Sequence, residues 1–170
     1  MTADSDVISP YRFEPDGLWS SSEESDSDDS DSQSSFTERL GNTTWCSCAK
    51  CVPMPRAVEC TCCRELTEVE ERLEESGACV TCLEAFNTVC LDKNVLYTAL
   101  VTMHTVRGDE VETPTTNRSY RLAAYRQFTN WTYNFLGKGN RRVVPACVVN
   151  VVRLKFPEPD YTGFKAAELK

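Results

Sequence analysis

The chain has 170 residues, of which 41% are hydrophobic and ten are cysteines, and its formal net charge is -8. This length suits one domain plus a tail, and the lack of internal repeats argues against a repeat array. No window approaches the roughly 20 apolar residues of a membrane-spanning helix, and the start, MTADSDVISP, lacks the features of a signal peptide. We therefore expect a cytoplasmic protein with reduced cysteines, and the nucleus is the alternative location.

The negative charge is concentrated at the N-terminus. Residues 1–40 hold 11 acidic and 2 basic side chains, whereas the rest of the chain holds 15 acidic and 16 basic ones. From Ser20 to Ser35 no residue is apolar, so this stretch has nothing to bury that would offset the entropy of ordering it. The sequence predicts a disordered acidic tail over 1–40, a folded domain over 41–166 and a short C-terminal tail over 167–170.

Short helices are expected in the first half of the folded domain. The sequence TEVE at 67–70 has the form of a capping box and begins a surface helix that ends near Gly77. Apolar residues between Leu83 and Val101 indicate two more helical pieces, broken around Asp92. A loop should follow in the sequence RGDE.

The strongest periodic signal lies in the second half. Apolar residues at spacings of four, four, three and four are Tyr120, Ala124, Phe128, Trp131 and Phe135. This spacing draws one apolar stripe along a helix of about four turns, which we place in the core. The segment VVPACVVNVVRLKF at 143–156 fits a strand or a buried helix, and we favour the helix. Together these elements predict a mainly α-helical fold.

The cysteines form three clusters and two single positions. The sequence WCSCAKC gives C-x-C-x-x-C, CTCC gives C-x-C-C and CVTC gives C-x-x-C, whereas Cys90 and Cys147 stand alone. A C-x-x-C turn lets two thiolates approach one tetrahedral ion at about 2.3 Å, so this density indicates metal binding. Two tetrahedral ions need eight ligand positions, which seven thiolates fill when one sulfur bridges the ions. Zinc is preferred over an iron–sulfur cluster because the sequence has no ferredoxin-like C-x2-C-x2-C run. The sequence predicts a small, irregular, cysteine-rich domain organised by a dinuclear zinc cluster.

The order of six motifs carries a resemblance to a known family. The motifs WCSCAKC, CTCC, GACVTC, YRLAAYRQFTNW, VVPACVVNVVRLKFP and YTGFK run from about Trp45 to Lys165. Their order resembles the intracellular C-terminal "ballast" domain of the seventh subtype of ATP-gated P-two-X purinoceptor channels. The resemblance implies a compact, mainly helical cytoplasmic module with two zinc ions and a guanine-nucleotide pocket. By position, the implied zinc ligands are Cys46, Cys48, Cys51, Cys62, Cys63, Cys79 and Cys147.

Three cysteines fall outside the implied ligand set. Cys60, Cys82 and Cys90 are spare thiols, core residues or replacement ligands. Cys90 lies on a helical apolar stripe, so we expect it in the core.

The nucleotide pocket that the resemblance implies survives in part. By position, its residues are Arg121, Tyr125, Val143 and Val144. Arg141 and Arg142 compensate only if their turn points them inward, and Arg142 joins the expected set on that condition. Three positions depart from the family, because Leu122 replaces a histidine, Val149 an arginine and Glu158 a lysine. We expect guanine-nucleotide binding to be weak or altered.

Charge is also uneven within the domain. Residues 59–112 carry 12 acidic and 4 basic groups, whereas residues 113–157 carry eight basic groups and no acidic one. This basic block suits phosphate groups, nucleic acid, an anionic membrane surface or the chain's own acidic tail, and it also suits an ordinary solvated face.

The expected function is that of a non-enzymatic zinc-binding interaction or regulatory module with an unidentified protein partner. The alternative is a nucleic-acid-binding zinc protein that uses the basic block 113–157 and its interleaved aromatic residues. An enzyme is not expected, because an all-cysteine zinc cluster has no open position and His104 is the one histidine. Channel activity is not expected either, since fold similarity does not transfer it.

Overall fold

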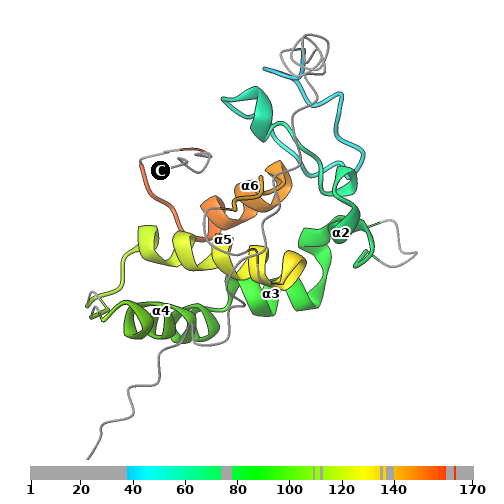
Figure 1. Cartoon of the computed structure of the whole chain (residues 1–170). Helices are drawn as coiled ribbons and strands as arrows, with labels where there is room; N and C mark the ends of the chain where they lie inside the picture. Colours follow the sequence, from blue (N-terminus) through cyan, green and yellow to red (C-terminus); the bar gives the residue numbers. More distant parts are fainter. Residues whose placement is uncertain are drawn as a thin grey trace, which may run out of the picture.

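The structure is a computed structural model that describes residues 38–73, 78–108, 110–111, 113–134, 136, 140–159 and 163. This described part is mainly helical and contains no strand, as the sequence predicts (Figure 1). Its elements are the 3-10 helices η1 (Ala57–Glu59), η2 (Cys63–Glu65) and η4 (Val80–Cys82) and the α-helices α2 (Thr67–Glu70), α3 (Glu84–Leu91), α4 (Lys93–Arg107), α5 (Asn117–Tyr133) and α6 (Ala146–Lys155). None of the helices described has the length and apolar character needed to cross a membrane.

Some sequence predictions fall outside the described residues. They concern the tail as far as residue 37, the helix end at Gly77, the stripe residue Phe135 and the C-terminal tail 167–170. Arg39, which precedes the predicted domain start at residue 41, contacts Cys60 and Glu65.

The predicted break around Asp92 is confirmed. The Asp92 carboxylate accepts hydrogen bonds from the backbone N–H groups of Asn94 at 2.8 Å and Val95 at 3.1 Å, so Asp92 is the N-cap of α4. The helix ends at Gly108, whose φ of +75° is a left-handed conformation that glycine adopts without a steric penalty. Since α4 still includes Arg107, the loop after it begins one residue later than the RGDE sequence predicts.

Helix α5 lies at the centre of the packing, as its apolar stripe predicts. It contacts α2, α3, α4 and α6, and in Figure 1 it lies between α6 above and α4 below. Phe128 is fully buried and meets Phe86 of α3 and Trp131 edge to face, with ring centroids 6.3 Å apart in both pairs. Burying one such side chain contributes about 1.5–3 kcal/mol, so this aromatic group is a main source of stability.

The segment 143–156, for which the sequence fitted a strand or a helix, contains the helix α6, as we favoured. Its residues 146–149 are all buried, which a strand exposed on one face would not require. These residues are buried because α6 packs against η2 and η4 as well as α5. Tertiary burial on several sides thus overrides the strand propensity of the valines.

The segment after α6 is fastened to the first half of α5. The buried Arg121 donates from Nε to the Phe156 carbonyl at 2.6 Å and from a terminal nitrogen to the Glu158 carbonyl at 3.2 Å. Tyr120 stacks on the Phe156 ring at 5.3 Å, and the Asn117 amide donates to the carbonyl of the next residue, Pro157, at 2.8 Å. These carbonyl partners satisfy the guanidinium of Arg121 in its buried position.

Candidate metal centre

The seven cysteines implied as zinc ligands come together in two groups. The first group is Cys46, Cys48, Cys51 and Cys62, and the second is Cys48, Cys63, Cys79 and Cys147. Within each group the sulfur atoms all lie within 4.8 Å of one another. Cys48 belongs to both groups, which is the arrangement expected when one sulfur bridges two ions.

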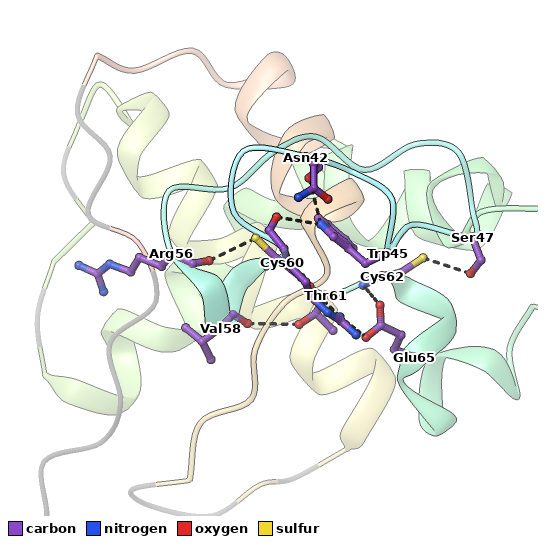
Figure 2. Close-up of polar contacts among 10 residues, drawn as sticks. Asn42, Trp45, Ser47, Arg56, Val58, Cys60, Thr61, Cys62 and Glu65 are labelled. Carbon is purple, nitrogen blue, oxygen red and sulfur yellow. Dashed lines mark hydrogen bonds and ion pairs between the residues drawn. The ribbon is translucent and has the colours of Figure 1, made fainter. Parts of the chain in front are cut away.

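A hydrogen-bonded loop presents the first three cysteines. The indole of Trp45 donates to the carbonyls of Arg39 at 3.1 Å and Asn42 at 3.0 Å, which anchors the start of the loop (Figure 2). Ala49 then adopts a φ of +58°, a left-handed conformation that is costly for a residue with a Cβ. This turn reverses the chain inside the C-x-x-C sequence, so that Cys48 and Cys51 face the same point.

The next two cysteines begin the 3-10 helix η2. The Glu65 carboxylate accepts from the Cys62 backbone N–H at 3.1 Å, which forms a capping box with Cys62 as the N-cap (Figure 2). Arg39 pairs with the same carboxylate at 2.6 Å and donates to the Cys60 carbonyl at 3.0 Å. The sequence analysis overlooked Glu65 and Arg39, although a glutamate three residues after Cys62 has capping-box spacing.

Two further links bring the distant cysteines to the same place. Arg64 donates to the carbonyl of Ala78 at 3.2 Å, which holds the residue before Cys79 against η2. The Ala146 backbone N–H donates to the Thr61 carbonyl at 3.0 Å, so the first turn of α6 starts beside the second cysteine cluster. Cys147 lies in that first turn.

The sulfur spacing fits tetrahedral zinc. Four sulfur ligands about 2.3 Å from one ion are about 3.8 Å apart along each edge of the tetrahedron. The separations found are 3.7 Å for Cys46–Cys48, 3.8 Å for Cys48–Cys51 and 3.9 Å for Cys63–Cys79. A disulfide would need about 2.05 Å, so these pairs are too far apart for cross-links and have a spacing that could hold a metal ion.

The electrostatics of the group also suit a cation. A hydrogen bond from Cys147 lowers the pKa of the Cys51 thiol to about 6. Hydrogen bonds to Cys51, Cys63 and Cys79 raise the pKa of Cys147 itself, and burial raises that of Cys48. Thiolates this close repel one another, so all seven are favoured together only beside positive charge, which divalent ions supply. Around the sulfur atoms, Ser47 lies 3.7 Å from Cys62 and Thr81 donates to Cys79 at 3.2 Å.

The remaining three cysteines have different surroundings. Cys60 is buried and donates to the carbonyls of Met54 at 3.9 Å and Arg56 at 3.5 Å. Cys82 is exposed. Cys90 is fully buried in the hydrophobic core, as predicted, and burial raises its pKa to about 12. None of the three belongs to the two sulfur groups.

The residues implied as nucleotide contacts lie in two places. Arg121 lines a hollow of about 370 Å³ together with Val149 and Glu158, and Tyr125 and Val144 pack beside it. Val143 is half-buried next to Val144. Arg142 lies elsewhere, over the Tyr133 ring at 5.8 Å, near the opposite end of α5. The structure therefore does not bring Arg142 to the other four.

The aromatic residues of the basic block are engaged in packing. Tyr120 stacks on Phe156, and Trp131 packs against Phe128 with the Arg72 guanidinium 5.0 Å from its ring centre. Burial raises the pKa of Tyr125, which marks that phenol as largely enclosed. The arginines at 118, 126, 141 and 142 are exposed, whereas Tyr120, Tyr125 and Trp131 pack against other side chains.

A comparison with known protein families identifies a matching family model. The model of the P2X purinoreceptor 7 intracellular domain matches residues 8–165. The match includes all seven grouped cysteines, and it begins upstream of Trp45, where the resemblance of motifs starts. Because it covers most of the chain, this protein belongs to the P2X purinoreceptor 7 intracellular domain family.

Proposed function

We propose that the chain is a non-enzymatic interaction module whose fold is organised by two zinc ions. The observation that carries the proposal is the sharing of Cys48 between two groups of four sulfur atoms. Cys46, Cys51 and Cys62 would complete one tetrahedron, and Cys63, Cys79 and Cys147 would complete the other. Zinc would supply the positive charge that keeps these thiolates ionised, and it would join four separate segments of the chain.

The test is the zinc content of single-cysteine variants, measured by native mass spectrometry and elemental analysis. The wild-type chain should carry two zinc ions. Cys48→Ser removes the shared ligand and should lower the occupancy of both sites, whereas Cys46→Ser should affect one site. Cys82→Ser is the control, because its exposed thiol lies outside both groups. A folded wild-type protein without metal, or equal loss from Cys48→Ser and Cys82→Ser, would contradict the proposal.

The role as an interaction module rests on the family, since the matched family is a receptor intracellular domain. Two closed all-cysteine sites leave no coordination position for a substrate, which argues for a structural use of the metal. We expect a cytoplasmic location and a protein partner. Capture of a partner by zinc-loaded protein should be lost after chelation, because the surface that it recognises depends on the cluster.

We further propose that guanine nucleotides bind weakly in the hollow beside Arg121. Two of the hydrogen-bond donors of Arg121 are already used by backbone carbonyls, and the Glu158 carboxylate would repel phosphate. Arg153 also lines this hollow and is the cation best placed to attract a phosphate there.

We do not favour the alternative function, binding of nucleic acid through the basic block 113–157. The aromatic residues on which it depends pack against other side chains, as described above.

A further inference from the structure

A second hollow lies apart from the cysteine groups, between α2 and the C-terminal end of α5. Its volume is about 500 Å³, within the range of roughly 300–1,000 Å³ that is typical of small-molecule sites. Its polar and charged lining includes Glu68, Glu71, Arg72, Thr132, Tyr133 and Arg142. No cysteine lines it, and neither the zinc proposal nor the nucleotide proposal uses it.

Buried polar atoms without partners gather at this hollow. Among the described residues, five buried side-chain polar atoms lack a hydrogen-bond partner, and three of them belong to Arg72 (Nε), Thr132 (Oγ1) and Tyr133 (the phenol oxygen). Thr132 is only 4% exposed. Thr129, three residues earlier on the same helix, donates normally to the Tyr125 carbonyl at 2.8 Å. Since buried polar groups in native proteins are generally paired, three such atoms at one hollow indicate a partner from outside the chain.

The charges at the hollow are also unpaired within the described part of the chain. Two arginines and two glutamates line it, and among the described residues no ion pair joins any of these four side chains. Glu68 and Arg142 both act on the Tyr133 phenol, whose pKa is raised first by burial, then further by Glu68, and lowered by Arg142. Charges of both signs therefore surround the same phenol without neutralising each other directly.

Aromatic rings hold both arginines in place. The Arg72 guanidinium lies 5.0 Å from the Trp131 ring centre, and that of Arg142 lies 5.8 Å from the Tyr133 ring centre. A guanidinium over an aromatic face is attracted by the ring, and its N–H groups remain able to bind a carboxylate in a bidentate manner. The glutamates in turn offer acceptors for an ammonium group.

We propose that this hollow binds a small zwitterion, a molecule with one carboxylate and one ammonium group and the size of an amino acid or short peptide. The arginines would bind its carboxylate, the glutamates would bind its ammonium, and the hydroxyls of Thr132 and Tyr133 would pair with its polar atoms. A simple anion would be repelled by the two glutamates, and a neutral polyol would leave all four charges unpaired. The balanced charge of the lining therefore favours the zwitterion.

The first test is isothermal titration of the zinc-loaded full chain with the twenty common amino acids and trialanine. At least one should bind with a dissociation constant below about 1 mM and raise the melting temperature. Amidating its carboxylate or acetylating its amine should weaken binding at least about 10-fold. No binding by any of these probes at about 10 mM, or tighter binding of inorganic phosphate or sorbitol, overturns the proposal.

Single substitutions of residues that line the hollow test whether the zwitterion binds there. Thr132→Val keeps the shape of the side chain and removes the unpartnered hydroxyl, so it should weaken binding about 10-fold without lowering the melting temperature of the ligand-free protein. Arg142→Gln, at an exposed residue, should weaken binding similarly. Thr129→Val is the matched control on the same helix and should leave the affinity unchanged. Binding that survives both Thr132→Val and Arg142→Gln overturns the proposal.

Discussion

Individual cysteines of this chain differ in the reactivity that their surroundings allow. The thiolate is the form that alkylating reagents attack, so a raised pKa or enclosure slows the reaction. Burial raises the pKa of Cys90 to about 12 from the usual 9.0, which reduces its thiolate fraction at pH 8 about 1,000-fold. Cys82, by contrast, is exposed and lies outside both sulfur groups.

We therefore predict an order of alkylation. In the zinc-loaded protein at pH 8, iodoacetamide should modify Cys82 first and leave Cys90 unmodified, as measured by peptide mass spectrometry. Because Cys90 is favoured in its protonated form, its reactivity should begin to rise only as the pH approaches its raised pKa. Chelation should then expose the seven grouped cysteines to the reagent. Rapid modification of Cys147 before chelation would contradict its assignment as a ligand.

At the scale of elements, α5 serves as the support for the segment that follows α6. Arg121 is 8% exposed and satisfies the carbonyls of Phe156 and Glu158, so its removal would leave both without this donor. Arg121→Met should lower the free energy of unfolding by about 1.5–3 kcal/mol, measured by denaturant titration with excess zinc. The exposed Arg126 on the same helix provides the control, and Arg126→Met should change stability by less than about 0.5 kcal/mol. Equal effects of the two substitutions would show that the buried contacts are not important.

The same part of α5 lines the hollow in which we propose weak guanine-nucleotide binding. Titration of GDP and GTP should give dissociation constants weaker than about 1 µM, because Arg121 is engaged and Glu158 repels phosphate. Glu158→Lys reverses that charge and should tighten binding at least about 10-fold. This gain in affinity should become smaller as salt is added, since the interaction between the new lysine and phosphate is electrostatic. A submicromolar constant for the wild-type chain would disprove the prediction.

At the scale of the molecule, the grouped cysteines and the hydrophobic core all lie between residues 38 and 159. Deleting residues 1–37 should therefore leave two zinc ions bound and change the melting temperature by no more than about 2 °C. Arg39 must be kept, because it pairs with Glu65 at the start of η2. Deletion of residues 1–41 also removes Arg39 and should lower the melting temperature. Loss of zinc after deletion of residues 1–37 would contradict the prediction.

The sequence predicted those features that depend on neighbouring residues. The break at Asp92 follows from a carboxylate that caps the next helix, and α5 follows from an apolar stripe at helical spacing. Both are local properties, because capping and amphipathicity act over a few residues. Local pattern did not decide between helix and strand for residues 146–155, because the valines favour a strand. The burial of the segment on several sides, which favours a helix, depends on the tertiary structure.

By itself, the sequence determined the helical class and the main helix, and the resemblance carried by its motifs implied the set of thiols that come together. Spacing within a C-x-x-C turn is local, so such pairs can be recognised without a structure. Only the tertiary structure decided that Cys48 lies in both groups and that Cys147 reaches the second, because the contact of Ala146 with Thr61 joins segments far apart in the chain. It also separated Arg142 from Arg121, because Arg121 lies in the first half of α5 whereas Arg142, beyond the helix, lies over Tyr133 at its C-terminal end.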